Sequence, residues 1–372
     1  MTRLDKTHVT NVQAKSFPFD FWYEWYQKYY RQGLRLYLAE QGGNLNITST
    51  ARFPAVLRSL AAFRDSYTAG RLLGPLAPLS KSVANNVARL FGSDDRSTTP
   101  LVGEYLFRLS DGRELKVCID SHDSGELTSS DLAKVNDIYF KTNYWKRDSY
   151  DRRVIPLFNC NPIVIEHLKL LRALRNQTPT VDITFIVRVW GGNNEVEGSE
   201  HCLRLLEAVA KSKRSKFLLA YLVGGDIKSM TTRLEKAGIA YTMEPIPPKL
   251  LWEHTARSRL SIIRLGMHHC VPWRMCDQLA LGSCTVLDQH PKTQWTVPLV
   301  EGEHYLSLNT STSPDQPVAM DTEYRLIPSL LEEFLGNPKK VVATARASRN
   351  YFDEILDPKQ VGRQICETVL SW

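Results

Sequence analysis

The chain of 372 residues is longer than one typical domain core and suits two domains. Its 43% hydrophobic and 23% charged residues are ordinary for a globular protein, which excludes a disordered, fibrous or membrane-embedded chain. The net charge of +7 favours an anionic ligand or surface, and it fits nucleic acid, anionic lipid and a nucleotide diphosphate equally well.

The cysteines and the N-terminal residues indicate in which cellular compartment the protein is expected. The seven cysteines include no C-x-x-C pair, which predicts neither a disulfide framework nor a structural zinc site and favours a reducing cytosol. Met1 to Lys15 holds no apolar signal segment, and no apolar run is long enough to span a bilayer. We therefore expect a cytoplasmic protein without a transmembrane segment, and leave peripheral contact with a membrane open.

The N-terminal half has the weaker pattern of elements. The expected elements are strands at 8–12 and 44–50, a helix over 21–40, helices within 61–91, a β-hairpin across 105–119 and a strand at 138–140. Asp111-Gly112 predicts a type I′ turn for the hairpin. The aromatic residues from Phe17 to Tyr30 suit either a helix core or a platform on which a sugar stacks.

The C-terminal half alternates between strands and helices. The expected strands are 181–189, 217–223, 239–243, 260–265 and 285–287, with helices starting near 199, 226, 248 and 271. This spacing indicates βαβ units and a parallel, doubly wound sheet. Residues 339–372 predict two helices broken near Asp357-Pro358.

The segment from Arg259 to Asp288 is the most informative. It predicts a strand, a loop, a helix, a small-residue turn and a strand. The loop follows the carboxyl end of a parallel strand and leads into a helix N-terminus, two places where α/β proteins bind anionic ligands. Arg274 and Asp277 are three residues apart, so they share one face of that helix.

This segment resembles the donor-binding block of exostosin-like and fucosyltransferase-like glycosyltransferases with the GT-B fold. Arg274 matches the family's arginine, and Asp277 stands where glutamate is usual. The other matches are Leu279, Ala280, Gly282 and the closing strand at 285–287, and the departures are Pro272, Trp273 and Gln278. The resemblance implies that Arg274 binds donor phosphate and that Asp277 accepts hydrogen bonds from the ribose. A solvated surface pair is the alternative.

The resemblance also implies an overall architecture. It is an α/β fold with two Rossmann-like domains of the GT-B type, an interdomain cleft, and C-terminal helices that cross back to the N-terminal domain. We expect an acceptor-side domain over 1–160, a nucleotide-sugar donor domain over 161–350, and a helix over 351–372 that packs back on the first domain.

Five further positions are donor-binding candidates. Arg188 ends the first strand of the donor domain, where a guanidinium binds a diphosphate bidentately and offsets leaving-group charge without a metal. Gly191 and Asn193 lie in the following loop, and Gly224 ends the next strand, where a backbone can approach a ligand. His268 lies in the donor-side loop. A solvated arginine and ordinary glycine turns are the alternatives.

Acidic residues of the N-terminal half are the candidates for catalysis. Asp120, His122 and Asp123 follow a predicted strand, and an Asp–His neighbourhood supplies a base that deprotonates an acceptor hydroxyl. Asp20 is the alternative base, and a capping turn is the structural alternative for the cluster. No downstream residue has metal-ligand spacing to the cluster, so no metal is expected.

These features predict a metal-independent glycosyltransferase that moves a sugar from a nucleotide-sugar donor to a hydroxyl acceptor, either a glycan, a lipid-linked saccharide or a small molecule. The alternative is a non-catalytic two-domain module that binds a nucleotide or a glycan. A nucleic-acid-binding protein is a third interpretation, which has only the net charge and the basic, aromatic stretch from Lys141 to Arg147 in its favour. We expect no nucleic-acid partner.

Overall fold

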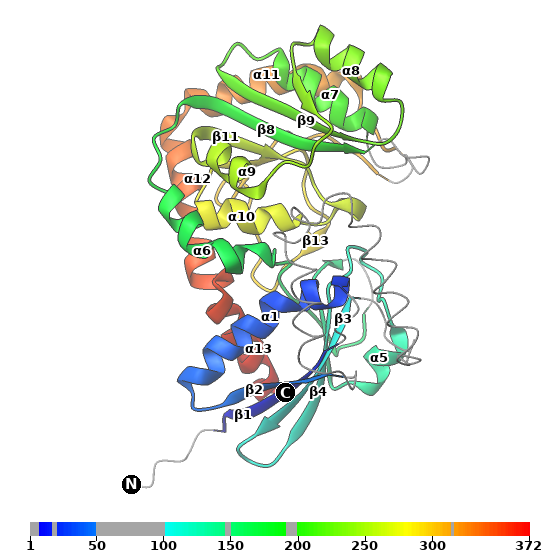
Figure 1. The fold of residues 1–372 in the computed structure, drawn as a ribbon, viewed down its shortest axis with the longest axis vertical. Helices are drawn as coiled ribbons and strands as arrows, with labels where there is room; N and C mark the ends of the chain where they lie inside the picture. The colour runs from blue at the N-terminus through cyan, green and yellow to red at the C-terminus, as the bar shows by residue number, and fades with distance from the viewer. Residues whose placement is uncertain (1–6, 17–20, 50–100, 146–149, 191–198, 314–315) are drawn as a thin grey trace.

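The computed structural model describes residues 7–16, 21–49, 101–145, 150–190, 199–313 and 316–372. Within these residues the chain forms two six-stranded sheets, one below the other in Figure 1, with helices packed against them. The helices predicted within 61–91 lie outside the described residues. None of the described helices is long and apolar enough to cross a membrane.

The first sheet is mixed. Its strands are β1 (Val9–Ser16), β2 (Asn44–Ser49), β3 (Val102–Leu109), β4 (Glu114–Asp120), β5 (Ile138–Lys141) and β7 (Val154–Pro156). They lie in the order β2-β1-β3-β4-β5-β7, and all neighbours are parallel except β3, which is antiparallel to β1 and β4. The parallel pair of β4 and β5 brings the residues after β4 beside the end of β5.

The predicted hairpin is confirmed, but its predicted type I′ turn is wrong. A type I′ turn needs positive φ at both central residues, and only Gly112 has it, at +88°. Leu109 N donates to Arg113 O at 2.9 Å, and Gly112 N donates to Leu109 O at 3.1 Å. The loop therefore has three residues and ends in a left-handed glycine.

Helices cover the two faces of the first sheet. On one face lies α1 (Phe21–Glu40), with the bounds that the sequence predicts. Tyr29 and Tyr30 of this helix are fully buried, so these two aromatic residues belong to the core and not to a sugar platform. The short α5 (Ser130–Val135) packs on the other face through Ala133.

The second sheet is entirely parallel. Its strands are β8 (Val181–Trp190), β9 (Lys216–Val223), β10 (Ala240–Thr242), β11 (Ser258–Ile263), β12 (Thr285–Leu287) and β14 (Leu306–Ser307). They lie in the order β10-β9-β8-β11-β12-β14, which is the 3-2-1-4-5-6 order of a Rossmann fold. The strand order reverses between β8 and β11, and such a switch point is where doubly wound sheets bind ligands.

Two layers of helices enclose this sheet (Figure 1). One layer contains α7 (Ser199–Ala210), α8 (Ile227–Lys236) and α11 (Asp321–Gly336), and the other contains α6 (Ile163–Leu174), α9 (Pro248–Ala256) and α10 (Trp273–Leu281). Asp226 caps α8, which begins near the predicted position, because its side chain accepts a hydrogen bond from Ser229 N at 3.0 Å.

The C-terminal helices cross from the second unit to the first. After α12 (Pro338–Tyr351) the chain makes a π-helical turn at Phe352–Leu356 and enters α13 (Pro358–Ser371), which packs along α1. The two helices touch backbone to backbone, since a Cβ on Gly362 would lie 2.1 Å from Gly33 O. The predicted break near Asp357 and the predicted return to the N-terminal unit are both confirmed.

The two units share one hydrophobic core. It joins Val12 and Leu34 of the first unit to Trp252 and Leu279 of the second. A small antiparallel pair, β6 (Tyr144–Trp145) with β13 (Thr293–Gln294), links them again. This is the expected α/β architecture of the GT-B type, and the shared core fixes how residues of the first unit lie against the second. The domain bounds at 160 and 350 stay a prediction.

Candidate active site

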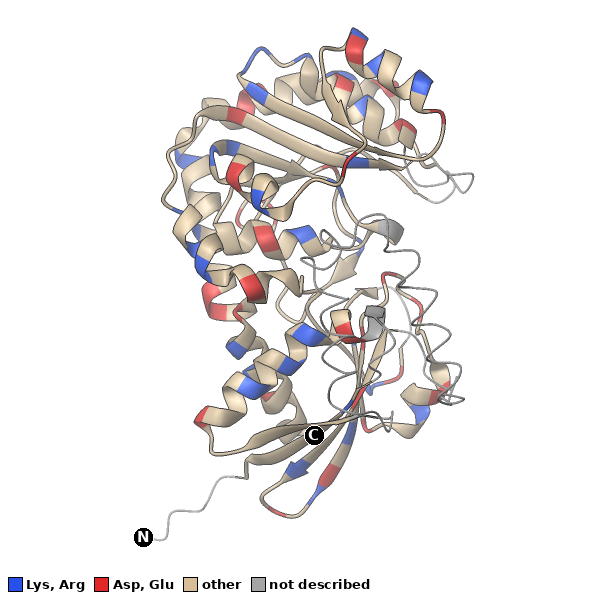
Figure 2. Ribbon diagram, viewed as in Figure 1, with Lys and Arg blue, Asp and Glu red and all other residues tan. Residues whose placement is uncertain are grey.

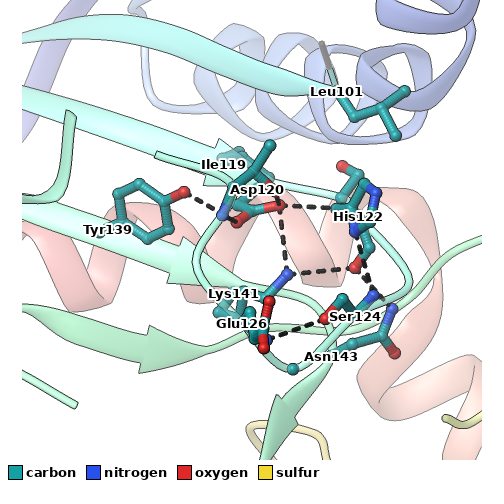
Figure 3. A network of polar contacts seen from close by, with 12 residues as sticks. Leu101, Ile119, Asp120, His122, Ser124, Glu126, Tyr139, Lys141 and Asn143 are labelled. Atoms are coloured by element: carbon teal, nitrogen blue, oxygen red, sulfur yellow. Dashed lines mark hydrogen bonds and ion pairs between the residues drawn. The ribbon is translucent and has the colours of Figure 1, made fainter. Parts of the chain in front are cut away.

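Asp120, the last residue of β4, lies at the centre of a buried polar network (Figure 3). Its carboxylate accepts hydrogen bonds from Tyr139 OH at 2.7 Å, from His122 N at 3.0 Å, and from Thr128 N and Oγ1 at 3.1 and 2.9 Å. Lys141 Nζ lies 3.2 Å from it. Asp120 is 0% exposed, and both of its oxygens accept hydrogen bonds. We therefore infer that Asp120 holds the loop after β4 in place, and we do not propose it as the base.

His122 connects the Asp120 network to the loop. Its ring Nδ1 accepts a hydrogen bond from Ser124 N at 3.1 Å, so the ring is tied to its own loop. Its backbone carbonyl accepts from Lys141 Nζ at 3.1 Å and from Asn143 Nδ2 at 3.0 Å (Figure 3). The network therefore holds the residue that directly precedes Asp123.

Asp123 is the predicted acid that reaches the second unit. Its carboxylate accepts a hydrogen bond from the side chain of Trp273, the first residue of α10. Its Oδ1 is buried and has no hydrogen-bond partner in the described part of the chain. Burial raises the pKa of the Asp123 carboxyl, and His122, the Trp273 hydrogen bond, His268 and Lys141 oppose that rise. A partly buried carboxylate with a raised pKa and an oxygen that no described residue hydrogen-bonds is suited to general-base chemistry.

The loop after β11 places His268 within electrostatic reach of Asp123. His268 and His269 both have left-handed backbone conformations, with φ of 57° and 58°. Such conformations are uncommon for residues other than glycine, and they often mark functional loops. His269 Nδ1 lies 3.0 Å from Gln289 Nε2, so His269 is tied to the loop that follows β12. The structure thus separates the two histidines, with His268 as the one whose charge acts on Asp123.

The carboxyl edge of the second sheet contains a small pocket. Its lining is His201, Arg264, Leu265, Gly266, His268, His269, Gln289, Thr312, Ser313 and Pro317. The residues come from the loops after β11, β12 and β14 and from the first turn of α7. The pocket therefore lies at the edge where open α/β sheets bind ligands.

Two arginines end the strands on either side of the switch point. Arg188, near the end of β8, is exposed, and its guanidinium carbon lies 4.3 Å from the centre of the exposed Trp190 ring. Arg264 follows β11, lines the pocket and donates to Cys202 Sγ at 3.1 Å. The sequence analysis singles out Arg188 but not Arg264. Arg264 could have been found as a cationic residue directly after a predicted strand of a parallel sheet.

Arg274 and Asp277 are not a solvated surface pair. Asp277 is 3% exposed, and its two oxygens accept hydrogen bonds from Asn161 Nδ2 at 2.7 Å and from Trp252 Nε1 at 3.0 Å. Burial raises its pKa to about 6, and these two hydrogen bonds oppose the rise. Asp277 thus joins α10 to α9 and to the residues before α6, and we leave it out of the proposed ribose contacts.

Arg274 lies beside β8. Its Nη1 donates to Ile186 O at 2.6 Å, and its buried Nε has no partner among the described residues. Burial lowers the pKa of Arg274 to about 10, so the guanidinium remains charged at neutral pH. Its predicted contact with donor phosphate stays a proposal.

The remaining predicted site residues have fewer contacts. Gly224 follows β9, is exposed and has a φ of 70°. Asp20, Gly191 and Asn193 lie outside the described residues. In the part of the chain that the structure describes, no group of three His, Cys, Asp or Glu side chains is arranged to hold a metal ion. All seven cysteines are free and buried.

The sequence analysis missed a polar triad behind the pocket. His201 is 1% exposed, and its Nδ1 and Nε2 lie 2.5 Å from Tyr324 OH and 3.2 Å from Asp288 Oδ2. Asp288 also accepts from Leu265 N at 2.9 Å. The triad therefore holds the loop after β11 in place, and no sequence signal places α7, α11 and the end of β12 together.

Comparisons with known proteins give similarity at the level of solved structures only. A scan against protein-family models found no match, and a search of curated proteins found none. The chain is similar to Anabaena Alr3699/HepE in complex with UDP and glucose, with 12% identity, a TM-score of 0.45, and coverage of 98% of this chain and 100% of that chain. Acinetobacter baumannii MurG has 12% identity, a TM-score of 0.42 and coverage of 92% and 95%.

A putative UDP-N-acetylglucosamine 2-epimerase from Listeria monocytogenes is similar to the same degree. It has 10% identity, a TM-score of 0.45, and coverage of 97% of this chain and 96% of that chain. Similarity this low identifies neither a ligand nor an activity of this chain, and the exostosin-like or fucosyltransferase-like subtype stays a prediction.

Proposed function

We propose that the protein is a glycosyltransferase that transfers a sugar from a nucleotide-sugar donor to a hydroxyl acceptor. The observation that carries this proposal is the meeting of Asp123, from the loop after β4, with Trp273 and His268 of the second unit. A carboxylate with an oxygen that no described residue hydrogen-bonds thereby lies next to the ligand-binding edge of a Rossmann-type sheet.

In this proposal Asp123 is the general base. The acceptor oxygen attacks the anomeric carbon of the donor sugar while the bond from that carbon to the diphosphate oxygen breaks. The acceptor proton passes to the Asp123 carboxylate, whose Oδ1 has no competing hydrogen bond among the described residues. Removing such a base typically lowers a rate by about 100-fold to 10,000-fold.

The arginines are the proposed ligands of the leaving diphosphate. Arg188 lies near the end of β8 and Arg264 follows β11, the two strands that flank the switch point, and Arg274 lies next to β8. A guanidinium binds phosphate oxygens through charge-assisted hydrogen bonds and stabilises the charge that develops as the sugar leaves. Three arginines can serve this purpose without a metal, so we propose metal-independent transfer in the cytoplasm.

The proposal is tested by incubating the protein with a panel of nucleotide sugars and measuring release of the nucleoside diphosphate. We expect release from one donor, with and without magnesium, and a loss of about 100-fold or more in Asp123→Asn. Asp111→Asn, an aspartate in the hairpin loop next to β4, is the matched control and should keep the wild-type rate. Binding of a nucleotide without any release, for every donor and acceptor tried, would favour the non-catalytic module.

A further inference from the structure

Lys141, the last residue of β5, is a fully buried cation. It is 0% exposed, and its ammonium group lies 3.2 Å from Asp120 Oδ1 and 3.1 Å from His122 O (Figure 3). Lysine is almost never fully buried unless it is paired, and burial lowers the pKa of Lys141 while the Asp120 carboxylate opposes that change. Because burying an ammonium group costs free energy, we look for the role of Lys141 in the residues that it contacts.

Stability alone does not account for this ion pair. Replacing a buried ion pair by apolar residues of similar volume is often neutral or stabilising, because the pair must lose its hydration. Asp120 already accepts hydrogen bonds from Tyr139, His122 and Thr128 without the lysine. The contact that only Lys141 and Asn143 supply is the one to the His122 carbonyl.

That carbonyl belongs to the peptide bond between His122 and Asp123. Its oxygen accepts from Lys141 and Asn143, while the His122 N–H donates to Asp120 at 3.0 Å. Both backbone polar groups of His122 are thus fixed by buried partners (Figure 3). The direction in which the chain enters Asp123 is set by β4 and β5, and Asp123 in turn accepts the hydrogen bond from Trp273.

Lys141 also acts on Asp123 through its charge. The groups that act on the Asp123 carboxylate are His122 in its own loop, Lys141 from β5, and His268 and Trp273 from the second unit, with Tyr26 of α1 also nearby. Lys141 is the cation among them that is fully buried and therefore least screened by solvent. Its positive charge lowers the pKa of Asp123 against the effect of burial.

We propose that Lys141 is the positioning residue of the active site: through the His122 carbonyl it directs Asp123 toward the second unit, and it places a buried positive charge near that carboxylate. This inference rests on the proposed function for its catalytic meaning. Its physical content concerns Asp123 and Lys141 alone, and it can be measured without a substrate.

The test is an NMR titration of the full chain with aspartate labelled at the carboxyl carbon. The Asp123 signal is the one that disappears in Asp123→Asn. We expect Lys141→Met to raise the midpoint of this signal, because it removes a nearby opposite charge. If Lys141→Met does not fold, since Asp120 is left unpaired, Lys141→Gln keeps a hydrogen-bond donor near Asp120, removes only the positive charge and should raise the midpoint in the same direction.

Tyr139→Phe is the matched control. It removes the 2.7 Å hydrogen bond to Asp120 from a residue that is also fully buried, yet it keeps the Lys141 charge and the contact with His122 O. It should lower the melting temperature and leave the Asp123 midpoint at the wild-type value. An unchanged midpoint in a folded Lys141 variant, or an equal rise in Tyr139→Phe, would overturn the inference.

Failure of the proposed function would look different. In that case wild-type protein would release no nucleotide from any donor, while the Asp123 midpoint would still rise in Lys141→Met. Where release is measurable, the acid limb of its pH profile should move upward with the Asp123 midpoint.

Discussion

The Trp273 side chain donates a hydrogen bond to the carboxylate of Asp123. Trp273 begins α10 of the second unit, and Asp123 lies in the loop after β4 of the first. The Trp273 ring also packs edge-on against Tyr26 of α1, with ring centres 4.6 Å apart. One side chain therefore bridges the two units at the point where we place the base.

Trp273→Phe tests this bridge. The phenyl ring keeps a contact with Tyr26 but cannot donate to Asp123. Because that hydrogen bond lowers the pKa of Asp123, its loss should raise the pKa, and the acid limb of the rate profile should move to higher pH. Initial rates across the pH range provide the measurement. Trp190→Phe, at an exposed position, is the control and should leave the limb in place.

Replacing the switch-point arginines tests the donor site. Arg188→Met removes a charge near the end of β8, and Arg264→Met removes a charge that lines the pocket after β11. We expect each to weaken nucleoside diphosphate binding by about 10-fold to 100-fold, since hydrogen bonds of charged groups contribute about 1.5–3 kcal/mol. Titration calorimetry measures the loss. Arg325→Met, exposed on α11, should bind like wild type, and equal affinities in all four proteins would contradict the placement.

The contact between α1 and α13 makes a prediction about stability. A Cβ on Gly362 would lie 2.1 Å from Gly33 O, so Gly362→Ala forces the two helices apart. We expect a loss of about 1–3 kcal/mol in the free energy of unfolding, measured with urea. Gly336→Ala is the control, because a Cβ there meets nothing within 4 Å. Comparable stability of the two variants would show that α13 does not pack this closely.

Asp277 predicts a pH dependence of stability. Its pKa is about 6 in the folded chain because burial disfavours its charge, against about 3.9 for an unfolded aspartate. Because the pKa is higher in the folded chain, protonation of Asp277 stabilises the fold. This stabilisation is fully present at pH values below the pKa of the unfolded chain, and it is lost as the pH rises through the pKa of the folded chain. Between about pH 4 and pH 6 the free energy of unfolding should therefore fall by about 3 kcal/mol on account of this group.

Asp277→Asn should lack that fall. Urea unfolding of wild type and variant at about pH 4 and about pH 7 isolates the contribution as the difference between their two changes. Asn161→Ala removes a donor that lowers the pKa of Asp277, so it should extend the fall to higher pH. The account would be contradicted if wild type and Asp277→Asn lost the same free energy of unfolding between about pH 4 and about pH 7.

Much of the fold follows from sequence periodicity. The βαβ alternation of the C-terminal half predicted the parallel sheet, and the aromatic-rich stretch of 21–40 predicted α1 with its observed bounds. The sequence analysis missed α11, in part because Pro328 interrupts the pattern of its buried residues. It also missed α6, which lies in the stretch read as a boundary between domains.

The site was harder to predict, because burial decides which acid is available. Asp120 and Asp123 are three residues apart and look alike in the sequence. The groups that enclose Asp120, Tyr139 and Lys141, lie on the neighbouring strand, so only the sheet pairing shows that Asp120 is covered. Asp277 differs from a surface residue for the same reason, since Asn161 and Trp252 come from other elements.

The central claim is that the second unit binds a nucleotide-sugar donor at its switch point, and nucleotide binding tests it most directly. The measurement is a thermal-shift screen of UDP, GDP, TDP, CMP and ADP, with and without magnesium, on wild type, Arg188→Met and Arg325→Met. We predict that one nucleotide raises the melting temperature of wild type and Arg325→Met regardless of magnesium, and that Arg188→Met loses most of the shift. If no nucleotide stabilises the folded wild-type protein, the claim is contradicted.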